Sequence, residues 1–333
     1  MFVLNANEPN ELATYLQSQN WIASSESILS ISKPGEGNMN CVLRVKTANR
    51  SLIVKQSRGY VEKYPQVVAP ADRAVTEGAF YKKVSTIDTI QDLMPRMIGL
   101  DSINNVIILE DLGAASDYTV LYQLEQKIGR AELKQLVGYL NGLHQSFQKT
   151  VIDDELMNVA MRKLNYEHIF EYPFNTDNGF DLDGIQLGLQ ALAMPYKINQ
   201  QLKDKIGVLG ALYLSKGKYL LHGDYYPGSW LKTGEGIKII DPEFCFYGLR
   251  EFDLAVMLAH LHITQQEDWV FAFIENNYLQ FKELNTTILN GFIGTEIMRR
   301  LIGLAQLPIQ IDLNTKANLL TFAKNLILEE DEK

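Results

Sequence analysis

The most constraining feature of this sequence is a pair of acidic turns on either side of a short predicted hairpin. The motif His222-Gly223-Asp224 ends an apolar run, and its glycine places Asp224 on a loop. Apolar runs at 230–232 and 237–240, joined by a glycine-rich turn, predict the two strands of the hairpin. Because a hairpin brings its two ends together, we expect Asp241, which follows the second strand, to lie near Asp224.

Two carboxylates placed in this way suit the transfer of a phosphoryl group from a nucleotide. One aspartate can orient an acceptor hydroxyl and take its proton, and a second can hold Mg²⁺ on the nucleotide phosphates. We therefore assign the catalytic role to Asp224 and the metal-binding role to Asp241. The alternative is a hairpin whose aspartates only cap turns. Agreement with the segments upstream favours the catalytic interpretation.

The upstream segments follow the order found in kinases. A glycine-bearing turn between two predicted strands, 28–31 and 41–45, lets backbone N–H groups approach phosphate without obstruction by Cβ atoms. The candidate phosphate-binding residues of this turn are Gly35, Gly37, Asn38 and Asn40. A strand predicted over 51–55 ends in Lys55, which we expect to contact the α- and β-phosphates.

Glu77 is predicted to pair with this lysine. It lies at helical spacing with Phe80 and Val84, in a helix predicted over 72–84. A carboxylate on an apolar helical face is unfavourable unless it is paired. Lys55 is its natural partner, and an exposed helical face carrying Glu77 is the alternative.

A hinge is predicted where the apolar run 106–109 breaks into a polar, glycine-containing turn. In a two-lobed kinase the adenine ring binds here, so we expect backbone groups from Glu110 to Leu112 to pair with its edge. The predicted organisation is an N-terminal lobe over 1–108, a hinge over 109–114 and a mainly helical C-terminal lobe over 115–333.

On these motifs the chain resembles the small-molecule kinases of the aminoglycoside-phosphotransferase and choline-kinase superfamily. Within that group it is most similar to the methylthioribose kinases, over about residues 28–305. The likeness rests on Gly37-Asn38-Met39-Asn40, Ile53-Val54-Lys55-Gln56, Asp72-Arg73-Ala74, Leu109-Glu110-Asp111-Leu112, His222-Gly223-Asp224, Gly228-Ser229, Asp241-Pro242-Glu243-Phe244 and Met298-Arg299-Arg300.

The resemblance implies an α+β, protein-kinase-like fold of two lobes, with a small β-rich N-terminal lobe. It also implies ATP-dependent transfer of the γ-phosphoryl group to a hydroxyl of a small metabolite, above all a methylthioribose-like sugar. Glu243 would join Asp241 in binding Mg²⁺, and Ser229 stands where most members have a metal-binding Asn. The resemblance suggests that Arg299 and Arg300 reach the acceptor, with plain surface cations as the alternative.

The acceptor and the activity itself have alternatives at this stage. The catalytic loop has Tyr226-Pro227 where the family has histidine and threonine, which leaves the acceptor open. An aminoglycoside, choline or fructosamine-type acceptor would use carboxylates, which the polar stretch 171–184 could supply. A catalytically silent nucleotide-binding scaffold is the alternative to an active enzyme, and the complete set of charged motif residues argues against it.

Composition predicts a cytoplasmic enzyme. The net charge of −9 argues against nucleic acid or an anionic membrane as a partner. The two cysteines, Cys41 and Cys245, lack metal-ligand spacing and suit a reducing compartment. No signal peptide or membrane-spanning run is visible. The sequence does not determine whether the chain forms a homodimer or prefers ATP to GTP.

Overall fold

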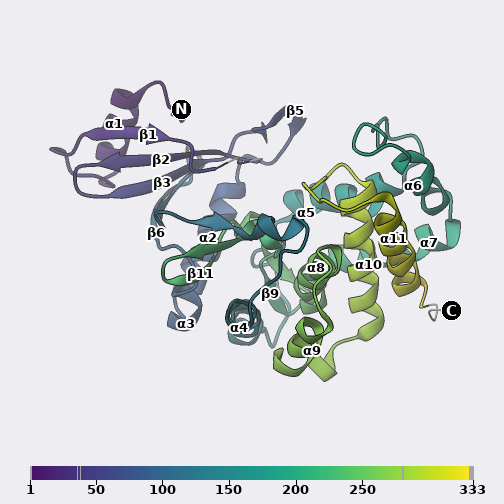
Figure 1. Cartoon of the computed structure of the whole chain (residues 1–333). Helices are drawn as coiled ribbons and strands as arrows, with labels where there is room; N and C mark the ends of the chain where they lie inside the picture. The colour runs from purple at the N-terminus through teal and green to yellow at the C-terminus, as the bar shows by residue number, and fades with distance from the viewer. Residues whose placement is uncertain (1, 36, 38, 280, 330–333) are drawn as a thin grey trace. The chain divides into compact units, whose positions relative to one another are not determined.

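The computed structural model describes residues 2–35, 37, 39–279 and 281–329, which form two compact units (Figure 1). The first unit comprises Met1–Ser116 and Lys232–Cys245, and the second comprises Asp117–Leu231 and Phe246–Lys333. The sequence analysis divided the chain differently, because it placed the segment 232–245 in the C-terminal lobe. This segment packs within the first unit, where the Ile239 N–H donates to the Leu93 carbonyl oxygen at 2.6 Å.

The first unit is built on a five-stranded antiparallel sheet with the strand order β1–β2–β3–β7–β6. The predicted strands 28–31, 41–45, 51–55 and 106–109 are all present in it. The bounds are β1 Ile28–Ser32, β2 Cys41–Thr47, β3 Ser51–Gln56, β6 Met97–Asp101 and β7 Val106–Glu110.

Helix α1 (Pro9–Ser18) covers one face of this sheet. Its buried residues Leu12 and Leu16 pack in one cluster with Leu52 and Val54 of β3. Because side chains alternate along a strand, Lys55 must point to the opposite face. The register of β3 therefore decides where the lysine lies.

Helix α2 (Arg73–Val84) packs against β6 and β7. A Cβ atom at Gly78 would lie 2.8 Å from the Leu100 side chain of β6, so a glycine is needed for this close approach. Glu77, Phe80 and Val84 are buried on α2, which confirms the apolar helical face predicted from their spacing.

Shorter elements complete the first unit and the small sheet associated with it. Strands β4 and β5 form an antiparallel hairpin, and three short strands pair in the order β11–β10–β8. The bounds are β4 Tyr60–Val61, β5 Tyr64–Val68, α3 Asp88–Gln91, β8 Ser116–Asp117, β10 Trp230–Thr233, β11 Gly236–Ile239 and η5 Pro242–Phe244. Strands β10 and β11 confirm the predicted hairpin.

The second unit is mainly helical. Helix α10 packs against both α8 and α11, and the two-stranded pair β9–β12 contacts α8 through β9. The helices are α4 Arg130–Ser146, α5 Val159–Tyr166, α6 Leu189–Lys197, α7 Gln200–Leu214, α8 Arg250–Ile263, α9 Asp268–Asn277, α10 Thr286–Ile302 and α11 Leu313–Leu328. The short elements are η1 Tyr118–Tyr122, η2 Glu167–Glu171, η3 Tyr172–Phe174, β9 Tyr219–Leu221, η4 Pro227–Ser229, β12 Phe246–Gly248 and η6 Phe281–Glu283.

Side-chain caps fix the starts of three of these helices. Asn199, Asn285 and Asp312 each accept a hydrogen bond from a backbone N–H in the first turn, at the starts of α7, α10 and α11. Such a cap satisfies a donor that the helix itself leaves unpaired, and it contributes about 1 kcal/mol. The cap at Asn285 therefore sets the start of the helix that carries both arginines of interest.

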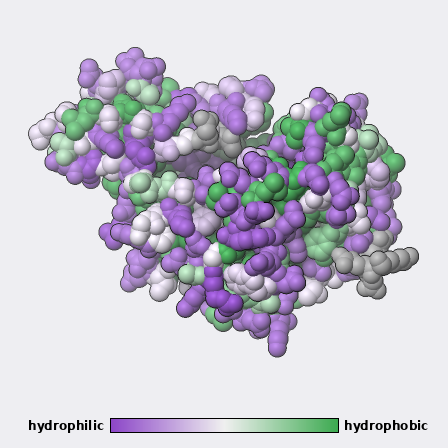
Figure 2. Space-filling model, in the orientation of Figure 1, coloured by the Kyte–Doolittle hydropathy of each residue, from purple (hydrophilic) through white to green (hydrophobic). Residues whose placement is uncertain are grey.

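The α+β class predicted from the sequence is confirmed, with an antiparallel sheet followed by a mainly helical part. Hydrophilic residues cover most of the face seen in Figure 2, and apolar residues form small groups between them. None of the helices in the described ranges is long and apolar enough to cross a bilayer.

Candidate functional site

The first unit contains a buried cluster around Lys55. The Lys55 Nζ atom lies 2.7 Å from Glu77 Oε2 and also contacts Asp241 Oδ1. The predicted ion pair between strand and helix is therefore present. Lys55 and Glu77 are only 4% and 1% exposed, so each charge requires its partner.

These neighbours shift the pKa values of both groups. Burial alone would lower the pKa of Lys55, but Asp241, Glu77 and Glu243 outweigh it and raise that pKa above its ordinary value. Burial raises the pKa of Glu77 in spite of the nearby lysine. The ammonium group stays charged, as a group that holds phosphate must.

Asp241 and Glu243 are held differently within this unit. Asp241 has φ +69° and ψ 48°, a left-handed conformation that is uncommon for residues other than glycine and is tolerated best by Asp and Asn. Its side chain is 48% exposed. The Glu243 carboxylate is buried and accepts a hydrogen bond from Asn40 Nδ2 at 2.8 Å.

Arg73 links Glu243 to three separate backbone segments. Its Nε atom lies 3.4 Å from Glu243 Oε2, and its side chain is fully buried. Its other nitrogens donate at 2.5–3.1 Å to the carbonyl oxygens of Met39, Arg58, Tyr60 and Pro70. The turn that carries Asn40 and the carboxylate of Glu243 therefore share one support.

These groups fit a nucleotide with its metal ion. Asp241 and Glu243 offer the hard oxygen ligands that Mg²⁺ prefers, and it usually binds one or two carboxylates together with phosphates. The Asn40 Oδ1 atom is buried without a hydrogen-bond partner among the described residues. A Cβ atom at Gly35 would meet nothing within 4 Å. In the described parts of the chain, no group of three or more His, Cys, Asp or Glu residues could hold a metal alone.

Apart from Ser229, the other residues predicted for nucleotide binding lie along the same unit. The Glu110 N–H donates to the Arg96 carbonyl oxygen at 2.9 Å. The predicted contact of Glu110 with adenine would therefore use its carbonyl oxygen. Leu112 follows Asp111, whose carboxylate is held by Arg44 Nε at 2.9 Å. Gly37 precedes Asn38, and Asn38 lies outside the described residues.

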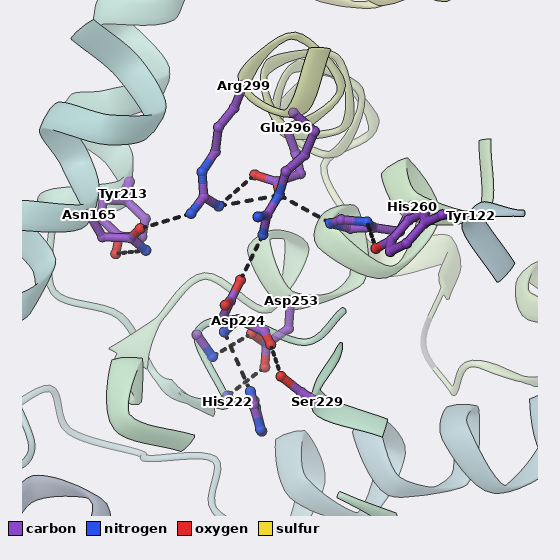
Figure 3. Close-up of polar contacts among 12 residues, drawn as sticks. Tyr122, Asn165, Tyr213, His222, Asp224, Ser229, Asp253, His260, Glu296 and Arg299 are labelled. Carbon is purple, nitrogen blue, oxygen red and sulfur yellow. Dashed lines mark hydrogen bonds and ion pairs between the residues drawn. The ribbon is translucent and has the colours of Figure 1, made fainter. Parts of the chain in front are cut away.

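The second unit contains the loop that carries Asp224 (Figure 3). The loop follows β9, which pairs with β12, and Gly223 has φ +87°, a conformation that favours glycine. The buried carboxylate of Asp253 accepts hydrogen bonds from the His222 and Gly223 N–H groups at 2.7 and 2.9 Å. Asp253 therefore supports the backbone of the loop that carries Asp224. His144 is buried and lies 3.3 Å from the same carboxylate.

Asp224 faces an arginine. Its Oδ1 atom lies 3.2 Å from Arg300 Nη2, and its side chain is 18% exposed. Burial raises the pKa of Asp224, while Arg300 and Arg299 oppose that shift. The structure thus brings Asp224 together with one of the two arginines predicted for the acceptor. Asp241 belongs to the other unit, and its closeness to Asp224 stays a prediction.

Both arginines converge on Glu296, a residue that the sequence analysis did not select (Figure 3 labels Glu296 and Arg299). Arg300 Nε donates to Glu296 Oε1 at 2.6 Å, and Arg299 Nη1 donates to Glu296 Oε2 at 3.0 Å. On the far side, His260 Nε2 lies 3.2 Å from Glu296 Oε1, and His260 Nδ1 lies 2.6 Å from the Tyr122 hydroxyl. Arg299 also donates to Asn165 at 3.4 Å.

Two loop residues complete this arrangement. The Ser229 hydroxyl donates to the Asp224 carbonyl oxygen at 2.9 Å, and this hydrogen bond links the two residues across the loop. A nucleotide contact at Ser229 would have to use the lone pairs of that hydroxyl oxygen. The Arg300 guanidinium lies 4.9 Å from the centroid of the Tyr226 ring.

Among the residues that the sequence analysis did not select, one had a local sequence signal. Glu296 precedes the arginines by three and four residues, which is the spacing at which opposite charges pair on a helix. His260 and Tyr122 come from distant segments, and nothing local marks them. The second cluster can orient a hydroxyl group and accept its proton, whereas the first can hold an anion beside a metal ion.

Comparison with known proteins identifies a family. The model of a family described as "Phosphotransferase enzyme family" matches residues 30–281. A methylthioribose kinase from Exiguobacterium sibiricum is 26% identical, over 81% of this chain and 79% of its own length. A methylthioribose kinase from Bacillus mycoides is 27% identical, over 85% of this chain and 81% of its own.

Solved structures show the same fold at lower identity. The choline kinase from Streptococcus pneumoniae superposes with a TM-score of 0.53 at 13% identity, covering 97% of this chain and 99% of that one. A spectinomycin phosphotransferase in complex with ADP and spectinomycin gives 0.53 at 15% identity, covering 96% and 98%. These likenesses confirm the predicted kinase-like fold.

The histidine behind Glu296 should titrate far below its ordinary range. Burial lowers the pKa of His260 to about 4, against the pull of Glu296. An unfolded chain takes up this proton near pH 6.5, so the imidazole subtracts about 3 kcal/mol of stability as the pH falls from 6.5 to 4. We expect His260→Gln to lose less stability over this interval than the unchanged protein, measured by urea unfolding.

Proton NMR supplies the control for this prediction. The chain has five histidines, so the imidazole signals can be assigned by single substitutions. His262, whose pKa burial also lowers to about 4, serves as the matched case without a Glu296 contact. A His260 signal that titrates near 6.5 would contradict the electrostatic account of this network.

Proposed function

Because this chain belongs to the phosphotransferase enzyme family, we propose that it transfers the γ-phosphoryl group of ATP to a hydroxyl of a methylthioribose-like sugar. As a member of this family it is a kinase that acts on hydroxyl groups of small molecules and uses ATP. The observation that carries the finer proposal is the contact between Asp224 and Arg300, within the network that also holds Arg299.

The nucleotide side of the reaction uses the first unit. Lys55, held by Glu77, would contact the α- and β-phosphates, and the turn from Gly35 to Asn40 would cover them. Asp241 and Glu243 would hold Mg²⁺, which neutralises the charge that develops on the phosphates. The backbone of Glu110 to Leu112 would pair with the adenine edge.

Asp224 is the proposed base. It would orient the acceptor hydroxyl and take its proton as the hydroxyl oxygen bonds to the γ-phosphorus. The bond from the γ-phosphorus to the bridging oxygen breaks, and ADP leaves. Arg300 at 3.2 Å favours the ionised carboxylate, which is the form that accepts a proton.

The arginine pair favours an acceptor without positive charge. Arg299 and Arg300 are 7% and 5% exposed, and their fixed forks of N–H groups suit the hydroxyl oxygens of a sugar. Choline or an aminoglycoside would need a carboxylate to pair with, and the two carboxylates of this cluster, Asp224 and Glu296, are already paired with the guanidinium groups. The near full-length relatives named methylthioribose kinase support the same choice of acceptor.

A direct binding experiment tests the acceptor. The protein, loaded with a non-hydrolysable ATP analogue, is titrated in a calorimeter with methylthioribose, choline, an aminoglycoside and a fructosamine in turn. We expect binding of the sugar and no measurable binding of the three amines, because both carboxylates of the cluster are already paired with guanidinium groups. Binding of an amine without binding of the sugar would overturn the proposed acceptor.

Replacing the base should stop the reaction without affecting nucleotide binding. Asp224→Asn keeps the shape of the side chain but removes the group that accepts the proton. We expect turnover to fall by at least about 10²-fold with unchanged affinity for ATP. Asp268→Asn, at an exposed position in α9, is the matched control and should keep full activity. An Asp224→Asn variant with full turnover would reduce this residue to a structural role.

Replacing the second proposed metal ligand should weaken the dependence on Mg²⁺. Glu243→Gln keeps the side-chain length but removes an anionic oxygen, so the Mg²⁺ concentration for half-maximal turnover should rise about tenfold or more. Calorimetry of ATP binding at several Mg²⁺ concentrations gives a second readout. Glu235→Gln, on the exposed turn of the β10–β11 hairpin, is the control. Identical Mg²⁺ titrations of Glu243→Gln and the unchanged protein would remove Glu243 from the site.

A further inference from the structure

The charged groups joined around Asp224 sum to zero. Two carboxylates, Asp224 and Glu296, face two guanidinium groups, Arg299 and Arg300. The Glu296 side chain is 2% exposed and the arginine side chains are 8% and 6% exposed, so water screens these charges only weakly. In such surroundings the loss of any one charge would change the electrostatic energy of a molecule bound beside the other three.

His260 adds no charge to this set near pH 7, because burial lowers its pKa to about 4. Arg299 and Arg300 hold the pKa of Glu296 well below its ordinary value although burial alone would raise it, so its ionised carboxylate can only accept. His260 Nε2 at 3.2 Å must therefore be the donor. In a neutral imidazole the other nitrogen then accepts, and the Tyr122 hydroxyl donates to it at 2.6 Å.

Glu296 also fixes where the arginines point. It lies one turn before them on α10, so its carboxylate receives Arg299 Nη1 at 3.0 Å and Arg300 Nε at 2.6 Å. With Nε bound to Glu296, Arg300 directs its Nη2 atom at Asp224. Figure 3 shows where Glu296, Arg299 and Asp224 lie. The guanidinium groups have no fixed rotamer on a helix unless a partner of this kind holds them.

We propose that Glu296 is a positioning and specificity-determining residue of this kinase: it aims both arginines and cancels one of their charges, so that the site selects an acceptor without net charge. This inference rests on the acceptor role proposed above for the arginine pair. It extends that role to a residue which need not contact the acceptor itself. The class of acceptor that fits is a neutral polyhydroxylated molecule, since its hydroxyl groups can accept from guanidinium N–H groups and bring no charge.

Three variants with different charge sums test this inference. Glu296→Gln gives a site charge of +1, and Arg299→Gln gives −1. The double variant, with Glu296→Gln and Arg299→Gln together, returns the sum to zero. Calorimetry on the full chain with a non-hydrolysable ATP analogue compares three probes: methylthioribose, which is neutral; choline, which is cationic; and ribose 5-phosphate, which is anionic.

The expected shifts have opposite signs. Relative to the neutral probe, Glu296→Gln should favour ribose 5-phosphate by about tenfold or more, and Arg299→Gln should favour choline to a similar extent. The double variant should recover the selectivity of the unchanged enzyme, although its affinities should be lower because Arg300 has lost a support. Affinity for the ATP analogue should stay within about twofold throughout.

A merely structural role for Glu296 predicts a different pattern. It predicts that the affinities for all three probes fall together. It also predicts that the two single variants do not shift selectivity in opposite directions. Either result would overturn the proposal. Glu251→Gln is the matched control, because Glu251 is also buried and accepts a hydrogen bond from the Asn285 N–H at 3.1 Å. It should leave the selectivity unchanged.

Two further outcomes of the experiment also have a defined meaning. If Glu296→Gln does not fold, Arg299→Gln and the unchanged protein still compare a site charge of −1 with one of zero, and equal selectivity in these two would overturn the proposal. If the unchanged enzyme binds none of the neutral probe, the acceptor proposed above is wrong. Opposite shifts for the two charged probes would still support the role of Glu296.

Discussion

The loop that carries Asp224 depends on one buried carboxylate. Asp253 is fully buried on α8, and it accepts from two consecutive backbone N–H groups, those of His222 and Gly223. Each of these donors would cost about 1–3 kcal/mol if it were buried without a partner. The left-handed backbone at Gly223 then turns the chain that follows these two N–H groups into the loop of Asp224. The position of Asp224, and hence its contact with Arg300, follows from this anchor.

The two clusters stabilise buried charge in the same way. Within them each charge meets at least one opposite charge: Lys55 meets Glu77 and Asp241 in the first unit, and Glu296 meets Arg299 and Arg300 in the second. Apolar residues of similar volume would often stabilise a fold as well or better, because ions lose hydration when they are buried. Stability alone therefore does not explain these clusters. Their retention points to chemistry on charged or polar ligands.

Sequence patterns predicted the parts of the site that local structure determines. The spacing of Glu77 on an apolar helical face required a cationic partner, and Lys55 is that partner. Glu296 could not be singled out in this way, because nearly every residue of α10 from Leu289 onward is buried and no polar face marks the helix. Arg73 was missed for a related reason. Its acceptors are backbone carbonyl oxygens, and carbonyl groups carry no sequence signal.

Tyr226, which the resemblance marks as a departure from the family's catalytic loop, leads back to the arginines. Its ring lies 4.9 Å from the Arg300 guanidinium and 5.3 Å from the His260 ring. An aromatic face attracts a guanidinium group and restricts its orientation. The substitution that seemed to leave the acceptor open therefore adds a third support to Arg300, beside Glu296 and Asp224. A catalytic loop altered in this way is consistent with a site that is organised around a fixed arginine.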